Sequence, residues 1–168
     1  MTSTSLREQS RSRGIAMTPE ERDQFLASQR TCRVATVGAG GRPHVAPLWF
    51  VWDGTYLWLS SLTRSQRWSD LMRNARIAIV CDTGHDYAEL RGVEIEGTAE
   101  PVGAVPWTGG ADEVINAVEV KFARKYLGAD TPVPPDGRHA WLRITPDKFT
   151  SWDFRKLAST GMSRRSDD

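Results

Sequence analysis

The stretch that decides the fold is Gly41-Arg42-Pro43-His44-Val45-Ala46-Pro47-Leu48-Trp49-Phe50-Val51-Trp52-Asp53-Gly54, followed by Thr63-Arg64-Ser65-Gln66-Arg67-Trp68. A turn and an apolar segment from His44 to Trp52 lead into Asp53-Gly54, a pair that is typical of a short hairpin. The next apolar segment ends at Ser60-Ser61, where hydroxyl groups begin. This order predicts a strand, a tight turn, a second strand and then a polar corner with two arginines that begins a helix.

The polar corner is suited to hold an anion. We expect a helix from about Ser65 to Asn74, and the first turn of a helix has unpaired N–H groups and the positive end of the helix dipole. Arg64 and Arg67 are three residues apart, so both guanidinium groups can lie on one side of this turn and bind a phosphate. We expect both to be exposed. An ordinary capped surface helix with two solvated arginines is the alternative at this point.

Composition excludes several classes of protein. The 168 residues carry a net charge of +1, from 22 Lys and Arg against 21 Asp and Glu, so no large positive field exists to bind a nucleic acid. No apolar run approaches the ~20 residues of a membrane span, and the N-terminus lacks the apolar core of a signal peptide. We therefore expect a cytoplasmic protein with no nucleic-acid and no membrane partner.

Cysteines and histidines give no sign of a metal site. Cys32 and Cys81 lie inside apolar runs without Cys-x-x-Cys spacing, which predicts two reduced core residues. The histidines, His44, His85 and His139, are scattered and form no ligand pair. No metal is expected.

The chain divides into one domain and two tails. Residues 1–16 and 158–168 are polar and lack periodicity, so we expect mobile N-terminal and C-terminal tails around a domain spanning 17–157. Thr18-Pro19-Glu20-Glu21 predicts a capped helix start, and the spacing of apolar residues predicts a second long helix over 111–127.

The other segments predict strands, and the fold class is mainly β with helices (α+β). Six or more short antiparallel strands with three helices describe a small β-barrel. The run 76–81 is apolar at successive positions, so both of its faces should be buried, which suggests that one face packs on a second copy in a homodimer. The expected strands are 32–37, 44–52, 56–59, 76–81, 93–100, 140–144 and 148–154.

Seven tryptophans are many for such a chain. They are either ordinary core residues or stacking surfaces around a flat heterocycle, and the sequence leaves both interpretations open.

The residues quoted above resemble the flavin-binding split-barrel superfamily, which includes pyridoxamine 5′-phosphate oxidase and the actinobacterial flavin/deazaflavin oxidoreductases. The resemblance covers residues 18 to 157 and implies a homodimer of six-stranded antiparallel split barrels with two cofactor clefts at the interface. The matching motifs are Gly41-Arg42-Pro43-His44, Pro47-Leu48-Trp49-Phe50, Trp52-Asp53-Gly54, Ser65-Gln66-Arg67 and Asn74-x-Arg76.

The resemblance also implies where a cofactor binds. The family's phosphate-binding serine-arginine-lysine run falls on Ser65-Gln66-Arg67, so Arg67 takes the place of the lysine. Residues 60–64 match the strand end and loop around the phosphate and ribityl chain, and 45–49 match the strand whose backbone faces the ring. The expected cofactor-binding residues are Val45, Ala46, Pro47, Leu48, Trp49, Ser60, Ser61, Thr63, Arg64, Ser65, Gln66, Arg67 and Trp152.

One departure from the family pattern bears on function. Ala46 and Val51 stand where the true oxidase has an arginine and a lysine, which argues against pyridoxamine phosphate oxidation. The resemblance implies hydride transfer between deazaflavin coenzyme F(420) or FMN and a small organic substrate, with F(420) favoured by the arginines at positions 64, 67, 73 and 76. The alternative is a non-catalytic carrier of a cofactor or tetrapyrrole (haem or biliverdin) on the same barrel. No nucleophile and base pair stands out, so no catalytic residue is predicted.

Overall fold

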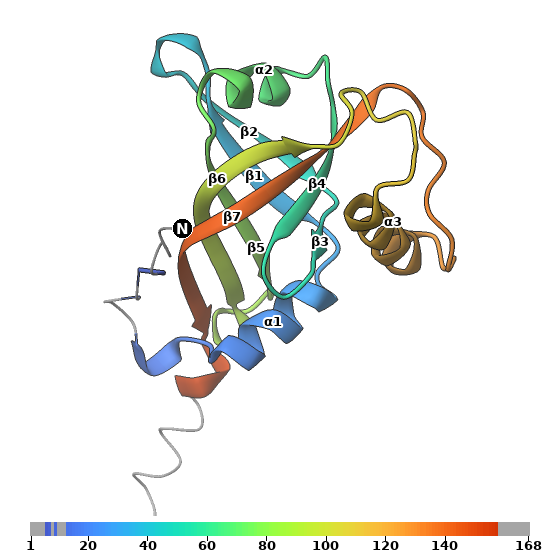
Figure 1. Cartoon of the computed structure of the whole chain (residues 1–168). Coiled ribbons are helices and arrows are strands. Elements are labelled where there is room, and N and C mark those ends of the chain that lie inside the picture. Colours follow the sequence, from blue (N-terminus) through green and yellow to red (C-terminus); the bar gives the residue numbers. More distant parts are fainter. Residues whose placement is uncertain (1–5, 8, 10–12, 158–168) are drawn as a thin grey trace, which may run out of the picture.

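The computed structural model describes residues 6, 7, 9 and 13–157. One seven-stranded antiparallel sheet, three α-helices and short 3-10 turns make up this part of the chain (Figure 1). The strands are β1 (Cys32–Val37), β2 (Pro43–Leu48), β3 (Val51–Trp52), β4 (Leu57–Leu62), β5 (Arg76–Thr83), β6 (Arg91–Val102) and β7 (His139–Asp153). The helices are α1 (Pro19–Ser28), α2 (Gln66–Arg73) and α3 (Glu113–Tyr126).

The sheet curls into a barrel because its two edge strands are neighbours in sequence. The strand order is β2-β1-β5-β6-β7-β4-β3, and only Trp49 and Phe50 separate β2 from β3. The predicted strand 44–52 therefore divides at these two residues, while the two predicted C-terminal strands form one long β7. The α+β class and the antiparallel barrel are confirmed, with seven strands in the described chain where the resemblance implied six.

Local signals place the helices and turns as expected. Thr18 caps α1 in a capping box with Glu21, and Ser65 caps α2 by accepting a hydrogen bond from the Trp68 N–H. Asp53 accepts hydrogen bonds from the two N–H groups that follow Gly54, which turns β3 into β4. In Figure 1, α1 and α2 lie at opposite ends of the barrel, and α3 lies alongside it.

Two apolar clusters hold the fold together. The barrel interior contains Phe50, Leu59, Ile79 and Ile95, with Cys32 and Cys81 among its buried free thiols. A second cluster packs α3 against the outside of the barrel; it comprises Val51, Trp58, Trp107, Ile115, Val118 and Trp141. This second cluster fixes the position of α3, and α3 forms one wall of the site described below.

The outward face of β2, β1 and β5 is partly exposed and contains apolar residues together with the Arg33–Asp82 ion pair. Ile77, Ile79 and Cys81 of β5 point into the core, whereas Ala78 and Val80 are only half-buried within one chain. Val80 of β5 pairs with Arg33 of β1, which pairs in turn with Pro47 of β2. Ala78 pairs in the same way with Ala35, which pairs with Val45. The single chain thus buries one face of the 76–81 run, and its outer face lacks a covering layer among the described residues.

The tails are only partly described. Arg7 pairs with Lys148 of β7, Gln9 hydrogen-bonds with Ser151, and Arg13–Ile15 forms a 3-10 turn. The predicted C-terminal tail, 158–168, lies outside the described residues, and the mobility of both tails stays a prediction. Within the described ranges, no helix is long and apolar enough to cross a membrane, and no cluster of three or more potential metal ligands occurs.

Candidate functional site

A cavity of about 590 Å³ lies between the end of β2, α3 and the segment that leads into β7. Four of the predicted cofactor-binding residues, Pro47, Leu48, Trp49 and Ser60, line it. The remaining lining residues are Thr31, Trp107, Glu119, Phe122, Val133, Pro134, Pro135, Asp136, His139 and Trp141. The cavity therefore joins the predicted ring-binding strand to residues from the C-terminal half of the chain.

Aromatic rings form much of the cavity wall. The Trp49 indole stacks on Tyr126 and contacts Phe122, whose ring meets Trp141 edge-on. Flat rings bind well against such surfaces, because stacked and edge-to-face contacts add to the effect of apolar burial. Trp49, Trp107 and Trp141 line the cavity, although Trp107 and Trp141 also belong to the second apolar cluster, whereas Trp58 is a core residue with 1% exposure that does not line it.

Two carboxyl groups in this wall have opposite electrostatic environments. Glu119 is 4% exposed and accepts a hydrogen bond from Trp141 Nε1 at 3.3 Å. Burial raises the pKa of Glu119, although hydrogen bonding by the Trp141 and Trp107 indoles opposes this shift. Asp136 accepts hydrogen bonds from the Arg138 and His139 N–H groups and from His139 Nδ1 at 2.7 Å, and these bonds hold its pKa well below the usual range. The cavity thus contains one carboxyl group whose pKa burial raises and one whose pKa hydrogen bonds lower, and the second also contacts the His139 ring.

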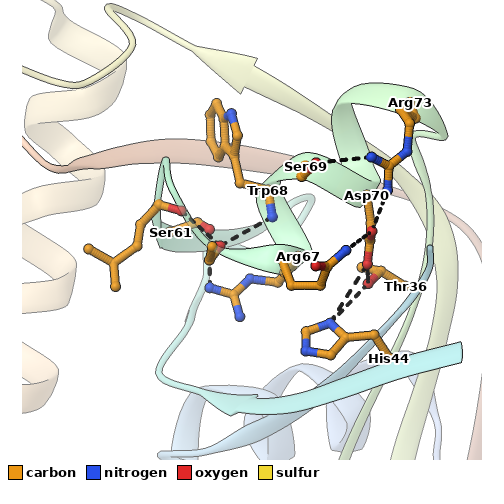
Figure 2. A network of polar contacts seen from close by, with 11 residues as sticks. Thr36, His44, Ser61, Arg67, Trp68, Ser69, Asp70 and Arg73 are labelled. Carbon is orange, nitrogen blue, oxygen red and sulfur yellow. Dashed lines mark hydrogen bonds and ion pairs between the residues drawn. The ribbon is translucent and has the colours of Figure 1, made fainter. Parts of the chain in front are cut away.

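Arg67 lies inside the protein, which corrects the expectation of an exposed arginine. The residue is 6% exposed; its Nη2 donates to Ser61 Oγ at 3.1 Å, and its buried Nε has no hydrogen-bond partner among the described residues (Figure 2). It is buried because the first turn of α2 packs over the end of β4. Desolvation lowers the pKa of Arg67, and an uncompensated buried guanidinium is suited to bind an anionic group.

The nearby carboxylate of Asp70 does not compensate Arg67, because other groups surround it. Asp70 is fully buried and accepts hydrogen bonds from Gln66, Thr36 and Arg73, at 2.7, 2.9 and 2.7 Å (Figure 2). His44 Nδ1 lies 3.8 Å away. Burial would raise the pKa of Asp70, but these bonds and charges outweigh it and lower the pKa.

The structure places the other predicted cofactor-binding residues outside the cavity. Arg64 is exposed and lines a small hollow with Thr63 and Arg138, so the described contacts do not bring Arg64 and Arg67 to one ion. Trp152 covers Gly92 at the far end of β7 and does not line the cavity. The remaining predicted residues have local roles or line no described hollow: Val45 is exposed on β2, Ala46 is half-buried there, Ser65 caps α2 and Gln66 bonds to Asp70.

Sequence reasoning missed Glu119, Asp136 and Tyr126, and it discounted His139. Glu119 follows Ile115 by four residues and precedes Phe122 by three, so its helical spacing indicated the buried face of α3. Tyr126 follows Phe122 by four residues, which also indicated this face of α3, and it stacks on Trp49 without lining the cavity. Asp136 and His139 carried no local signal, and they reach the cavity because β7 pairs with β4.

Comparisons with known proteins now place the chain in a family. The profile described as pyridoxamine 5′-phosphate oxidase matches residues 18–153, so the chain belongs to that family, and the resemblance predicted from the sequence is confirmed. It is 30% identical over 147 residues to a 5a,11a-dehydrotetracycline/5a,11a-dehydrooxytetracycline reductase of Streptomyces rimosus, a match that covers 84% of this chain and 87% of the relative.

Solved structures share the fold. A conserved hypothetical protein from Mycobacterium tuberculosis is 30% identical, with a TM-score of 0.76 over 89% of this chain and 93% of that one. An F420 reductase is 23% identical, with a TM-score of 0.59 over 79% of this chain and 98% of its own. The haem storage protein HutZ from Vibrio cholerae is 16% identical, with a TM-score of 0.61 over 79% and 93% of the two chains. The last two likenesses show the barrel alone.

Proposed function

We propose that this protein is an oxidoreductase that transfers a hydride between a bound deazaflavin F(420) or FMN and a small, flat organic substrate. The observation that carries the proposal is the cavity, in which the predicted ring-binding residues Pro47–Trp49 face an aromatic wall from α3 and β7. A reductase relative that spans 84% of the chain supports the same reaction class.

Arg67 fits the phosphate of such a cofactor. Its guanidinium is buried with an unpartnered Nε, and it is held by Ser61, while the adjacent Ser60 lines the cavity. A buried cation without a counter-ion is costly, and an anionic ligand removes that cost. Ser60 and Ser61 point to opposite faces of β4, and Arg67 is not among the residues that line the cavity, so the proposed phosphate site lies outside the cavity that would hold the ring.

The cofactor supplies the hydride when it is bound, and the chain supplies binding, orientation and exclusion of water. The 45–49 strand would support the ring, and the tryptophans and prolines of the cavity would exclude water and hold a flat substrate against it.

F(420) is the favoured cofactor because its anionic tail requires basic surface outside a phosphate pocket. Arg64 and Arg76 are exposed, and Arg138 shares the hollow of Arg64. Arg73 contributes less than the sequence suggested, since its guanidinium bonds to Asp70 and Ser69 (Figure 2). The proposed surface for the anionic tail is therefore a set of separated arginines rather than a compact phosphate-binding cluster.

We further propose a homodimer that packs through the outward face of β2, β1 and β5. This face presents Val45, 66% exposed, and Val37, 42% exposed, together with Val80 and Ala78. A specific interface buries roughly 1,000 Å² or more, and covering this face would give the 76–81 run its second buried side.

Competitive titration tests the proposed cofactor. Purified cofactor-free protein is titrated with F(420), FMN, haem and biliverdin, and bound F(420) is then assayed for hydride transfer. We expect F(420) to bind tightest, with a steeper loss of affinity in salt than FMN because more of its charge pairs are exposed. FMN that F(420) cannot displace would reverse the choice of cofactor, and preferential haem or biliverdin binding without turnover would favour the carrier.

A further inference from the structure

The cavity between β2, α3 and β7 is acidic, although arginines lie close to it. Its titratable lining residues are Glu119, Asp136 and His139, and the part of the chain that the structure describes places no lysine or arginine in its wall. Two neighbouring arginines, Arg64 and Arg138, line a separate hollow. The charge of the cavity therefore favours a cation over the anionic parts of the proposed cofactor.

One of the two carboxyl groups has partners of its own. Asp136 accepts hydrogen bonds from the Arg138 and His139 N–H groups, and its Oδ2 lies 2.7 Å from His139 Nδ1 and 3.4 Å from Arg138 Nη2. The hydrogen bonds and the His139 ring hold the pKa of Asp136 well below the usual range. This carboxylate is compensated by the protein and needs no cation from a ligand.

Glu119 is the acid that lacks a counter-ion. It is 4% exposed, and among the described residues no lysine, arginine or histidine forms an ion pair with it; the groups that contact its carboxyl are the Trp141 and Trp107 indoles. The next lysines of α3 lie elsewhere, since Lys121 lines a different hollow and Lys125 lies over the Phe50 ring. A buried carboxylate without a cation is costly, so a cation in the cavity would stabilise its charged form.

Aromatic rings stand at steep angles to one another around the same cavity. The centroids of Trp49 and Phe122 are 6.0 Å apart with 50° between the planes, and those of Phe122 and Trp141 are 5.8 Å apart with 80° between the planes. Rings set at different angles around one space can turn more than one π surface to a ligand, and this arrangement binds ammonium groups. The Trp141 indole also donates to Glu119 at 3.3 Å, so the carboxyl and the aromatic wall meet.

We propose that this cavity binds an organic cation, a protonated or quaternary amine on an apolar body, with the ammonium group beside Glu119 and Trp141. The volume of about 590 Å³ is far larger than an ammonium group, and Pro47, Pro134 and Pro135 add apolar wall for the rest of the ligand. Binding of the cation does not depend on the proposed function. That the cation is the substrate of the oxidoreductase rests on the proposed function, and it makes the substrate an amine-bearing compound.

Two probes of equal shape test the proposal by calorimetric titration of the full-length protein without cofactor. They are para-(hydroxymethyl)phenyltrimethylammonium and para-tert-butylbenzyl alcohol, which differ in a charged nitrogen that replaces a carbon. The ammonium probe should bind about tenfold more tightly or better, because only the charge distinguishes the two. Equal affinities, or no saturable binding of the ammonium probe, would overturn the proposal.

The variant Glu119→Gln assigns the charge, with Glu113→Gln as a matched control. Glutamine keeps an acceptor for Trp141 Nε1 and removes the charge, and Glu113 is an exposed residue of the same helix. Glu119→Gln should lose most of the preference for the ammonium probe and keep its affinity for the neutral one. Glu113→Gln should behave as wild type. A preference that survives in Glu119→Gln would overturn the assignment.

The variant Trp49→Leu tests the aromatic wall, with Tyr87→Leu as its control. Trp49 is 47% exposed and Tyr87 is 70% exposed, so neither change should prevent folding. Leucine keeps an apolar contact but has no π surface. Trp49→Leu should lower the affinity for the ammonium probe about threefold to thirtyfold, and the affinity for the neutral probe less. Equal losses for both probes would contradict a contact between the cation and the rings.

The cation site and the proposed function fail separately. Binding of the ammonium probe by a protein that shows no F(420)- or FMN-dependent turnover would contradict the proposed function and leave the cation site in place. Hydride transfer by a protein that does not distinguish the two probes would overturn the cation site and leave the proposed function in place.

Discussion

The indole of Trp49 lies parallel to the ring of Tyr126, with the ring centroids 4.4 Å apart and 6° between the planes. The Tyr126 hydroxyl accepts a hydrogen bond from the Phe50 N–H at 2.9 Å, and it lies 2.8 Å from the carbonyl oxygens of Phe50 and Arg30. The last turn of α3 is thereby attached to the link between β2 and β3. This attachment holds the C-terminal end of α3 against Trp49, one of the residues that line the cavity.

Replacement of Tyr126 by phenylalanine should destabilise the protein. The change keeps the stacked ring but leaves the Phe50 N–H without its acceptor, and such a loss costs about 1–3 kcal/mol. Urea denaturation measures the difference in unfolding free energy. Tyr87→Phe is the control, because Tyr87 is 70% exposed, and its effect should stay within about 0.5 kcal/mol. Equal effects of the two substitutions would contradict the attachment.

The variant Arg67→Met should weaken cofactor binding and leave the cofactor-free protein at least as stable as wild type. Charge-assisted bonds to phosphate contribute about 1.5–3 kcal/mol, so the Kd should rise about tenfold to a hundredfold. Methionine removes a buried charge that has no counter-ion, so the melting temperature without cofactor should not fall. Titration and thermal denaturation measure the two effects.

Arg64→Met serves as the comparison for Arg67, since Arg64 is exposed. We expect Arg64→Met to lose less affinity than Arg67→Met. Its affinity for F(420) should fall more than its affinity for FMN. Unchanged affinity of Arg67→Met for both cofactors would place the phosphate elsewhere.

Replacement of Asp70 by asparagine should remove part of the acid sensitivity of the fold. The pKa of Asp70 is lowered in the folded state, so its ionised form contributes stability that is present above the unfolded pKa of about 3.9 and is lost as the pH falls through the folded value. Wild type should exceed Asp70→Asn in melting temperature at neutral pH, and the gap should narrow toward low pH. Asp130→Asn, at a side chain that is 79% exposed, should show little gap at any pH.

The proposed dimer can be tested on its apolar face. Wild type should sediment as a dimer at micromolar concentration, and Val45→Asp should sediment as a monomer, because an unpaired charge would be buried between the copies. Val114→Asp is the control, since Val114 is 51% exposed on α3, away from this face. A monomeric wild type would refute the dimer, and a dimeric Val45→Asp would move the interface to another face.

Much of the fold could be predicted because its signals act over a few residues. The capping box at Thr18, the helix start near Ser65 and the Asp53-Gly54 turn all occur as predicted. The split between β2 and β3 was not predicted, since Trp49 and Phe50 continue the apolar pattern of the strand. Phe50 points into the barrel core and Trp49 toward α3, and this division depends on elements far away in the sequence.

The sequence by itself determined the approximate positions of the helices, most strands and the Asp53-Gly54 turn, and it carried the family motifs at residues 41–54 and 63–68, because backbone preference and hydrogen bonding within a few residues specify these features. Only the tertiary structure decided the burial of Arg67, the separation of Arg64 from it and the cavity that contains Glu119 beside Trp141. Burial of a charge depends on which surfaces pack over it. For Arg67 and Glu119 those surfaces come from strands and loops that meet only when the barrel closes.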